Sequence, residues 1–354
     1  MSDIKYHDGS FLLSYNKLLI FDVGGRSIGK SFFWKLFVVN NFLRKKEKGE
    51  MSRFIYLRRH KNDIDIMNKE NKFWADISIK LDGHKMETKS GETLTNFMID
   101  DEICGYGMGL SSTVKMKSVP FPDVDYIIFD EFIDETGSYI GSKDNPNTEP
   151  NLCASLLMSV ARGGGKVVRE NVKMVFIGNT HDKYNPYFVF HKISERFKPD
   201  TKIINGPYWV VFKDPAEGIA EEIGKTQIGA MLKNTNYGMM AMGGGWQNED
   251  GAYIGEMKGE KKYFCTLRSN GKVYGVFENT MGEYYISHMV DTSDLWKYAL
   301  TKRDMRDGHV LATKETKSWK IQLLYRAWCN NMIIYQDAEC KNMWEEYTSR
   351  RRIL

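Results

Sequence analysis

The chain has 354 residues, a length that accommodates two domains or two domains and a linker. Lys and Arg exceed Asp and Glu by 50 − 46 = 4, which excludes a histone-like polycation but leaves room for a local basic surface that binds nucleic acid. Hydrophobic residues make up 42% of the chain and aromatic residues 13%, so the chain can bury sizeable cores and a disordered protein is excluded.

Targeting and redox features are few. No stretch approaches the roughly 18 apolar residues of a membrane span, and the first ten residues lack the apolar segment of a secretory signal. The cysteines contain no Cys-x-x-Cys pair, so we expect reduced thiols rather than a disulfide framework or a zinc knuckle; they are Cys104, Cys153, Cys265, Cys329 and Cys340. A protein of the reducing cytoplasm fits this pattern.

The first two hundred residues alternate short apolar runs with longer amphipathic stretches. Helical spacing of apolar residues predicts a helix over 31–43, which ends in a run of cations and Gly49. Buried strands are predicted at 18–23, 54–57, 126–129 and 172–177. Apolar strands separated by helices indicate a parallel sheet covered on both faces.

The pattern changes near residue 205, where Asn205, Gly206 and Pro207 interrupt regular structure. Short helices are predicted within 214–245. Hairpin strands are then predicted at 263–267, 273–277 and 284–288, and helical periodicity returns from about residue 317. We therefore expect three parts: 1–205, a helical linker at 206–245, and a β-rich domain at 246–354.

A glycine-rich loop between the first strand and the first helix fits the pattern G-x-x-x-x-G-K-[ST] of a phosphate-binding P-loop. Its residues are Gly24, Gly25, Arg26, Ser27, Ile28, Gly29, Lys30 and Ser31. The backbone N–H groups would surround phosphate oxygens, Lys30 would reach the β- and γ-phosphates, and Ser31 would bind Mg²⁺. ATP and Mg²⁺ are therefore the predicted cofactors. The alternative is a glycine-rich turn that binds nothing.

Two adjacent acids follow the apolar strand 126–129. Asp130 is predicted to hold Mg²⁺ through water and Glu131 to polarise the attacking water. The pair is typical of α/β P-loop NTPases of the additional-strand, catalytic-glutamate class. In that class a polar residue at the end of a further strand senses the γ-phosphate, and Asn179 is the candidate. Solvated acids at a strand end and a turn-forming Asn are the alternatives.

Residues 12–200 resemble the DNA-packaging ATPases of small podophages of the phi twenty-nine type. The resemblance rests on several stretches in order: 13–15, 24–31, 54–59, 128–133 and 185–188. It implies a pentameric ring at the portal vertex of an empty capsid, which converts ATP hydrolysis into translocation of double-stranded DNA. It also implies an RNase H-like α+β domain at the C-terminal end.

The resemblance further suggests residues that act on a neighbouring subunit. Arg162 aligns with the family's arginine-finger segment, Lys117 matches a second basic position, and Arg169 is a possible sensor. The alternative for each is a solvated surface cation. The first hairpin strand carries no acid, and Glu278 and Asp291 alone do not make a two-metal site. We therefore expect a vestigial nuclease fold that serves in docking.

A motor that holds DNA without reading its sequence needs cations that contact phosphates. The favoured group follows the second strand: Arg58, Arg59 and Lys61. Other runs lie at 44–48 and in the tail 350–352, which could instead bind packaging RNA or the portal.

Three functions remain open in ranked order. The first is a phage DNA-packaging motor ATPase, working in the cytoplasm of an infected bacterium and transiently at the procapsid portal vertex. The second is a large terminase with an active C-terminal nuclease. The third is an assembly factor that does not hydrolyse ATP and whose P-loop binds nucleotide only to lock the assembly.

Overall fold

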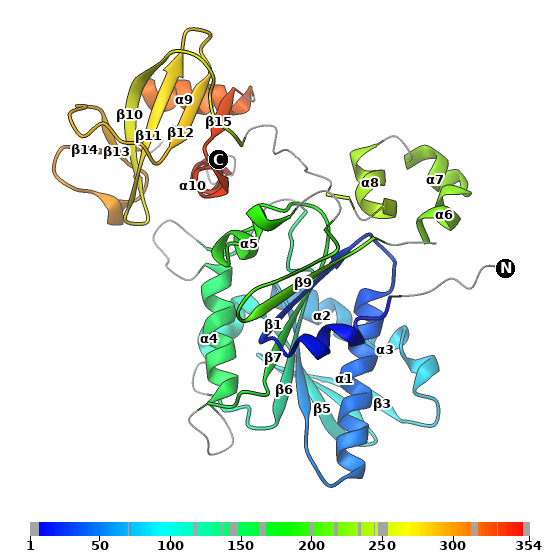
Figure 1. Cartoon of the computed structure of the whole chain (residues 1–354). Coiled ribbons are helices and arrows are strands. Elements are labelled where there is room, and N and C mark those ends of the chain that lie inside the picture. Colours follow the sequence, from blue (N-terminus) through cyan, green and yellow to red (C-terminus); the bar gives the residue numbers. More distant parts are fainter. Residues whose placement is uncertain are drawn as a thin grey trace. The chain divides into compact units, whose positions relative to one another are not determined.

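The chain divides into two compact units (Figure 1). The first comprises Met1–Ile140, Glu149–Lys183 and Arg196–Asn248, and the second comprises Gly141–Thr148, Tyr184–Glu195 and Glu249–Leu354. The computed structural model describes residues 7–69, 71–116, 119–135, 138–141, 148–162, 168–197, 201–215, 219–232, 235–243, 245–246, 254–312, 318–330 and 332–349. Within these ranges no helix has the length and apolar character needed to cross a membrane.

A nine-stranded sheet forms the centre of the first unit, in the order β3-β4-β5-β2-β6-β7-β1-β9-β8. Neighbours from β5 to β9 pair in parallel, whereas β3, β4 and β8 add antiparallel edges. The strands are β1 (Leu19–Gly24), β2 (Arg53–Arg58), β3 (Met86–Ser90), β4 (Thr95–Ile99), β5 (Glu102–Gly109), β6 (Val124–Asp130), β7 (Lys173–Asn179), β8 (Ile203–Asn205) and β9 (Trp209–Asp214).

The predicted parallel sheet is confirmed. Every residue of β1 is buried, because an apolar strand in the middle of a parallel sheet is covered on both faces. Strand β7 lies between β1 and β6, which is the additional-strand arrangement expected from the sequence. The antiparallel strands within 86–109 were not predicted, because their glycines and polar residues weaken the apolar pattern.

Helices α1 (Lys30–Glu47), α2 (Lys61–Lys69), α3 (Lys72–Ala75) and α4 (Glu149–Ala161) cover this sheet (Figure 1). Three short helices that follow β9 pack on one another: α6 (Ile219–Gly224), α7 (Gln227–Leu232) and α8 (Asn236–Gly243). The connection β1-α1-β2 crosses the sheet in one direction and β6-α4-β7 returns in the other, so right-handed crossovers place α1 and α4 on opposite faces. The buried side of α1 packs on the strands through Trp34, Val38 and Phe42.

The sheet extends beyond the boundary expected at residue 205. Strand β9 pairs in parallel with β1, with Leu19 opposite Trp209 and Gly24 opposite Asp214. The break at 205–207 is therefore the turn of the β8–β9 hairpin. The short helices expected in 214–245 are present as α6, α7 and α8.

The second unit contains a six-stranded sheet in the order β14-β13-β10-β11-β12-β15. The antiparallel strands β10, β11 and β12 form a meander, and β13 and β14 continue in parallel beside β10, as expected for an RNase H-like α+β fold. The elements are α5 (Pro186–Phe190), β10 (Lys261–Ser269), β11 (Lys272–Asn279), β12 (Tyr284–Ser287), β13 (Lys297–Ala299), β14 (His309–Leu311), α9 (Trp319–Cys329), β15 (Ile333–Tyr335) and α10 (Ala338–Ser349).

Candidate active site

The predicted nucleotide-binding residues meet at one edge of the first sheet. Because β1, β6 and β7 run in parallel, their carboxyl ends lie together there. Gly24 lies opposite Asn179, and the N–H of Thr180 donates to the carbonyl of Gly24 over 3.2 Å. Asn179 is therefore beside the P-loop, where the sequence had placed it.

The P-loop conformation depends on two left-handed residues, Ser27 at φ 60° and Gly29 at φ 100°, which turn the chain from β1 into α1. Inside the loop, Nζ of Lys30 donates to the carbonyls of Gly24 (3.3 Å) and Gly25 (2.5 Å). Burial lowers the pKa of Lys30 to about 8, against the opposing attraction of nearby aspartates. This ammonium group is held where phosphate oxygens would replace the carbonyls as its acceptors.

Ser31 and Asp130 are in direct contact. Oγ of Ser31 donates a 2.9 Å hydrogen bond to Oδ1 of Asp130, joining the first turn of α1 to the end of β6. A hydroxyl and a carboxylate are hard oxygen donors of the kind that Mg²⁺ prefers, so the pair fits a magnesium site.

Glu131 is held by an arginine of its own chain. Arg58, the last residue of β2, donates one hydrogen bond to Oε2 of Glu131 and another, of 3.2 Å, to Oδ2 of Asp130. The Tyr56 hydroxyl also donates to Asp130. Glu131 has φ 60°, an uncommon conformation for a residue with a side chain and one that recurs at functional sites.

The environment of Glu131 raises the pKa of its carboxyl group. Its side chain is 63% exposed, yet partial desolvation by the surrounding protein, followed by repulsion from Asp130, raises its pKa. Arg58 opposes this rise. Such a carboxylate is suited to accepting a proton from water.

For two of the three residues expected to contact DNA, the structure shows a different role. Arg58 lies in the nucleotide site, and Arg59 is only 6% exposed, with Nε 2.7 Å from Oε1 of the buried Glu149. Arg59 is thus an internal ion-pair residue and is not available to a DNA phosphate. Lys61 pairs with Asp65 over 2.8 Å.

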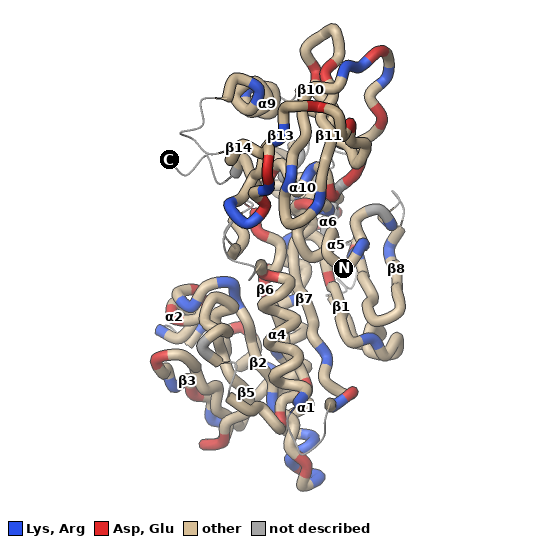
Figure 2. Tube along the Cα trace, turned by 90° about the vertical axis from the view of Figure 1, so that its left-hand side faces the viewer, with Lys and Arg blue, Asp and Glu red and all other residues tan. Residues whose placement is uncertain are grey.

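The remaining basic residues do not form one continuous surface in this view, since Figure 2 shows basic positions interspersed with acidic ones. The tail 350–352 lies outside the described residues.

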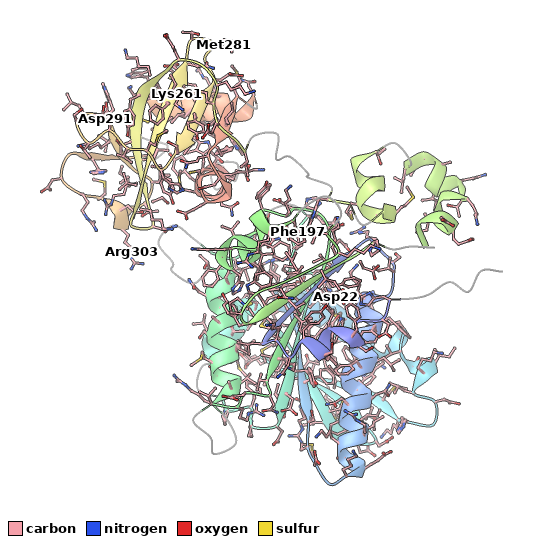
Figure 3. All side chains as sticks on the ribbon, viewed as in Figure 1. Asp22, Phe197, Lys261, Met281, Asp291 and Arg303 are labelled. Carbon is pink, nitrogen blue, oxygen red and sulfur yellow. The ribbon has the colours of Figure 1, made fainter. Side chains whose placement is uncertain are left out.

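A buried ionic cluster lies beneath the P-loop and was not foreseen. Nε2 of His7 is 2.7 Å from Oδ2 of Asp22, and Nδ1 is 2.6 Å from Oδ2 of Asp214. Trp34 donates to the same Asp22 oxygen over 2.7 Å. Figure 3 labels Asp22 in the first unit. Burial opposes protonation of His7, but Asp22 and Asp214 outweigh it and raise the pKa of His7 to about 9.

The sequence contained one signal for this cluster. Asp22 interrupts an otherwise apolar strand, and a buried carboxylate requires a partner. Nothing in the sequence identified His7 or Asp214 as that partner, because they lie 15 and 192 residues away, the second figure being 214 − 22.

The P-loop also contacts the helical segment before the second unit. The N–H of Arg26 donates to the carbonyl of Ala241 in α8 over 3.1 Å. A Cβ on Gly25 would lie 2.8 Å from that same carbonyl oxygen, so the close approach requires glycine. One of the predicted phosphate-binding N–H groups is thus engaged by α8.

Two of the candidate trans-acting residues, Arg162 and Arg169, lie away from this edge. Arg162 follows α4 and is exposed. Arg169 joins the end of α4 to the start of β6, donating to the carbonyls of Val160 (3.0 Å) and Val124 (2.6 Å). Strand β6 separates Val124 from Asp130 by about 20 Å, so Arg162 is remote from its own P-loop.

The other two candidates have different outcomes. Arg169 also pairs with Asp125 over 3.2 Å and is an internal structural residue rather than a sensor. Lys117 lies outside the described residues.

In the part of the second unit that the structure describes, Glu278 and Asp291 have separate partners. Neither β10 nor the adjacent β13 contains Asp or Glu. Glu278 accepts a hydrogen bond from the Tyr284 hydroxyl over 2.7 Å. Asp291, which is labelled in Figure 3, accepts one from the Ser293 hydroxyl. Within the described strands, β10 and β13 therefore offer no carboxylate for two-metal chemistry.

Comparison with known proteins decides the family. A model of the podovirus DNA encapsidation protein (Gp16) family matches residues 1–353. The chain belongs to this Gp16 family. Family membership assigns it to DNA encapsidation and confirms the resemblance seen in residues 12–200, which now extends over nearly the whole chain.

Similar proteins cover the chain from end to end. The DNA packaging proteins of Bacillus phages phi29 and PZA are each 28% identical over 362 residues, covering 100% of both chains. Among solved structures, the bacteriophage Phi-29 viral genome packaging motor assembly matches with a TM-score of 0.67, 24% identity and 99% of each chain. The Phi-28 gp11 DNA packaging motor matches with a TM-score of 0.62, 16% identity and 98% of each chain. The two structures agree with the Gp16 chain in fold.

Proposed function

We propose that this member of the Gp16 family is a packaging motor ATPase, which couples ATP hydrolysis to the movement of double-stranded DNA into a procapsid. The observation that carries the proposal is the joint placement of Lys30, Ser31, Asp130 and Glu131 at one sheet edge. These residues supply a phosphate-binding ammonium, a metal-binding pair and a general base.

Each side chain has a distinct role in this proposal. Lys30 and the N–H groups of the P-loop orient the phosphates, while Ser31 and Asp130 hold Mg²⁺, which neutralises charge on the phosphate oxygens. Glu131 accepts the proton of the attacking water. Asn179 is positioned beside Gly24 to contact the γ-phosphate.

A ring oligomer fits the position of Arg162. Since this side chain is remote from its own P-loop, it would act at the γ-phosphate of a neighbouring subunit, and Lys117 is a second candidate there. We propose a pentamer that contacts the portal, DNA and packaging RNA. The similarity to the Phi-29 viral genome packaging motor assembly supports participation in an assembly of this kind, and the pentamer and the packaging RNA are our extension of it.

The second unit would serve in docking, because its central strands lack carboxylates. A terminase-like nuclease is the competing function. Incubation with plasmid DNA and Mn²⁺ distinguishes the two functions. Efficient cutting of the plasmid would refute the proposal that the second unit serves in docking and has no nuclease activity.

The motor proposal is tested with Glu131→Gln. This variant should bind ATP with unchanged affinity while hydrolysis falls by about 10²- to 10⁴-fold, because the general base is lost. Packaging of DNA into procapsids should stop with it. Normal steady-state turnover by Glu131→Gln would refute the assigned base, and wild-type chain that never hydrolyses ATP with DNA and procapsids would favour the assembly-factor function.

A further inference from the structure

The second unit brings together three side chains that commonly bind metals, far from the nucleotide site in sequence. His288 directly follows β12, Asp337 directly precedes α10, and Cys340 lies in the first turn of α10. One ligand atom from each lies within 4.8 Å of the other two. The spacing of 49 and 3 residues (337 − 288 and 340 − 337) matches no knuckle pattern, which explains why the sequence did not indicate it.

The distances fit a tetrahedral centre of the zinc type. Nε2 of His288 is 3.7 Å from Sγ of Cys340 and 2.8 Å from Oδ2 of Asp337. Bonds of about 2.0–2.1 Å to nitrogen and about 2.3 Å to sulfur at a tetrahedral angle hold those two atoms about 3.6 Å apart. The Asp337 oxygen would need to withdraw by about half an ångström, which a carboxylate rotation supplies.

Further contacts hold Asp337 and His288 in place. Oδ1 of Asp337 accepts the N–H of Cys340 over 2.9 Å, which leaves Oδ2 directed at His288. The backbone N–H of His288 donates to Oε1 of Gln336 over 2.9 Å, and the imidazole packs on the Tyr274 ring with centroids 5.5 Å apart. Supporting contacts of this kind fix ligand geometry in metal sites.

The donor chemistry selects the class of metal. A nitrogen, a sulfur and an oxygen donor together suit Zn²⁺ and neighbouring transition ions, whereas Mg²⁺ takes oxygen donors. Three protein ligands leave a fourth tetrahedral position for water. Cys340 is fully buried and His288 is exposed, so an ion could enter from the His288 side.

We propose that His288, Asp337 and Cys340 form a zinc-binding site that fastens the end of β12 to the start of α10. Binding transfers the thiol proton of Cys340 to solvent and forms the metal–sulfur, metal–nitrogen and metal–oxygen bonds. The site lies outside the nucleotide chemistry, and it stands whether or not the chain hydrolyses ATP.

The test uses the full-length chain, freed of metal with a chelator and then given Zn²⁺ alone. Mass spectrometry after gel filtration should find about one zinc per chain, and Co²⁺ should give a thiolate-to-metal absorption band that Zn²⁺ abolishes. A chain that retains no stoichiometric zinc, and shows no thiolate band with Co²⁺, overturns the proposal and leaves a hydrogen-bonded His–Asp pair at the start of α10.

Matched variants distinguish this site from other thiols. His288→Asn should weaken zinc binding at least about tenfold and Cys340→Ser should abolish the cobalt band. Cys329→Ser, at an exposed position ending α9, should leave both unchanged. If Cys340→Ser does not fold, His288→Asn decides alone, since its side chain is 40% exposed. Zinc that persists in His288→Asn but is lost in Cys329→Ser contradicts the assignment.

Discussion

Nη2 of Arg58 donates a hydrogen bond to the carboxylate of Glu131 in the same chain. Arg58 is the last residue of β2, the strand next to β6, and Glu131 directly follows β6. The same guanidinium reaches Asp130. In the proposed mechanism Glu131 is the general base, and pairing with Arg58 would make it less available to water. Turnover would then require Glu131 to exchange Arg58 for the attacking water molecule.

Arg58→Gln should move the acidic limb of the pH–rate profile to higher pH. Arg58 lowers the pKa of Glu131 against the raising effects of desolvation and Asp130, so its removal leaves those effects unopposed. The measurement is kcat for ATP hydrolysis across the acidic range. Lys61→Gln is the control, because Lys61 pairs with Asp65 instead, and an unmoved limb in Arg58→Gln would count against the pairing.

Ser31→Ala should raise the Mg²⁺ concentration needed for half-maximal hydrolysis about tenfold or more, because the hydroxyl that contacts Asp130 is lost. Ser31→Thr keeps a hydroxyl and is accepted by the motif, so it should restore the response. A magnesium titration of the three proteins is sufficient. Equal requirements in wild type and Ser31→Ala would remove Ser31 from the metal site.

His7 predicts a loss of stability on raising the pH. Its pKa is raised from 6.5 to about 9, so the folded chain holds a proton that the unfolded chain has lost, and stability falls through this range. Lys30, with a pKa lowered to about 8, contributes the opposite slope only above that value. Between pH 6.5 and 8 we expect about 2 kcal/mol of lost stability, measured by urea unfolding. In His7→Gln this slope should disappear; an unchanged slope would refute the assignment.

Arg59→Gln should lower the free energy of unfolding by about 3–5 kcal/mol, because it breaks the buried ion pair between Arg59 and Glu149. The more exposed Lys61→Gln should change it by less than about 1 kcal/mol. Urea denaturation of both variants compares an internal ion pair with a surface one. If both variants lower the free energy of unfolding by the same small amount, Arg59 behaves as a surface cation and the internal ion pair is refuted.

Arg162→Ala should reduce hydrolysis by about 10³-fold or more if it completes a neighbour's site. Mixing it with Glu131→Gln should restore part of the activity, since some interfaces then combine an intact Glu131 with an intact Arg162. A mixture of Glu131→Gln with Lys30→Ala supplies no complete site and should stay inactive. Absence of recovery in the first mixture would exclude the trans role.

The nucleotide site was largely predictable because its determinants are local. A glycine-rich turn between a strand and a helix, and two acids at a strand end, are contiguous patterns, and parallel strands bring such ends to one edge. Asn179 could be placed for the same reason. The order of these strands confirmed the expected class.

Long-range partners were not predictable. Arg58 ends β2 and Arg59 comes directly after it, and only the sheet order shows that the first reaches Glu131 and the second Glu149. The cluster of His7, Asp22 and Asp214 likewise depends on β9 lying beside β1. Strand β9 was missed because a breaker at 205–207 marks a hairpin turn as readily as the end of a domain.

The hydrogen bond from Arg26 to Ala241 introduces a competition. An N–H group pointing at the carbonyl of α8 cannot at the same time point fully at a phosphate oxygen. Nucleotide entry and the seating of α8 are then thermodynamically linked, and each weakens the other by the worth of that bond, about 0.5–1.5 kcal/mol. Binding of nucleotide to the P-loop would therefore weaken the attachment of α8, which belongs to the chain segment that leads into the second unit.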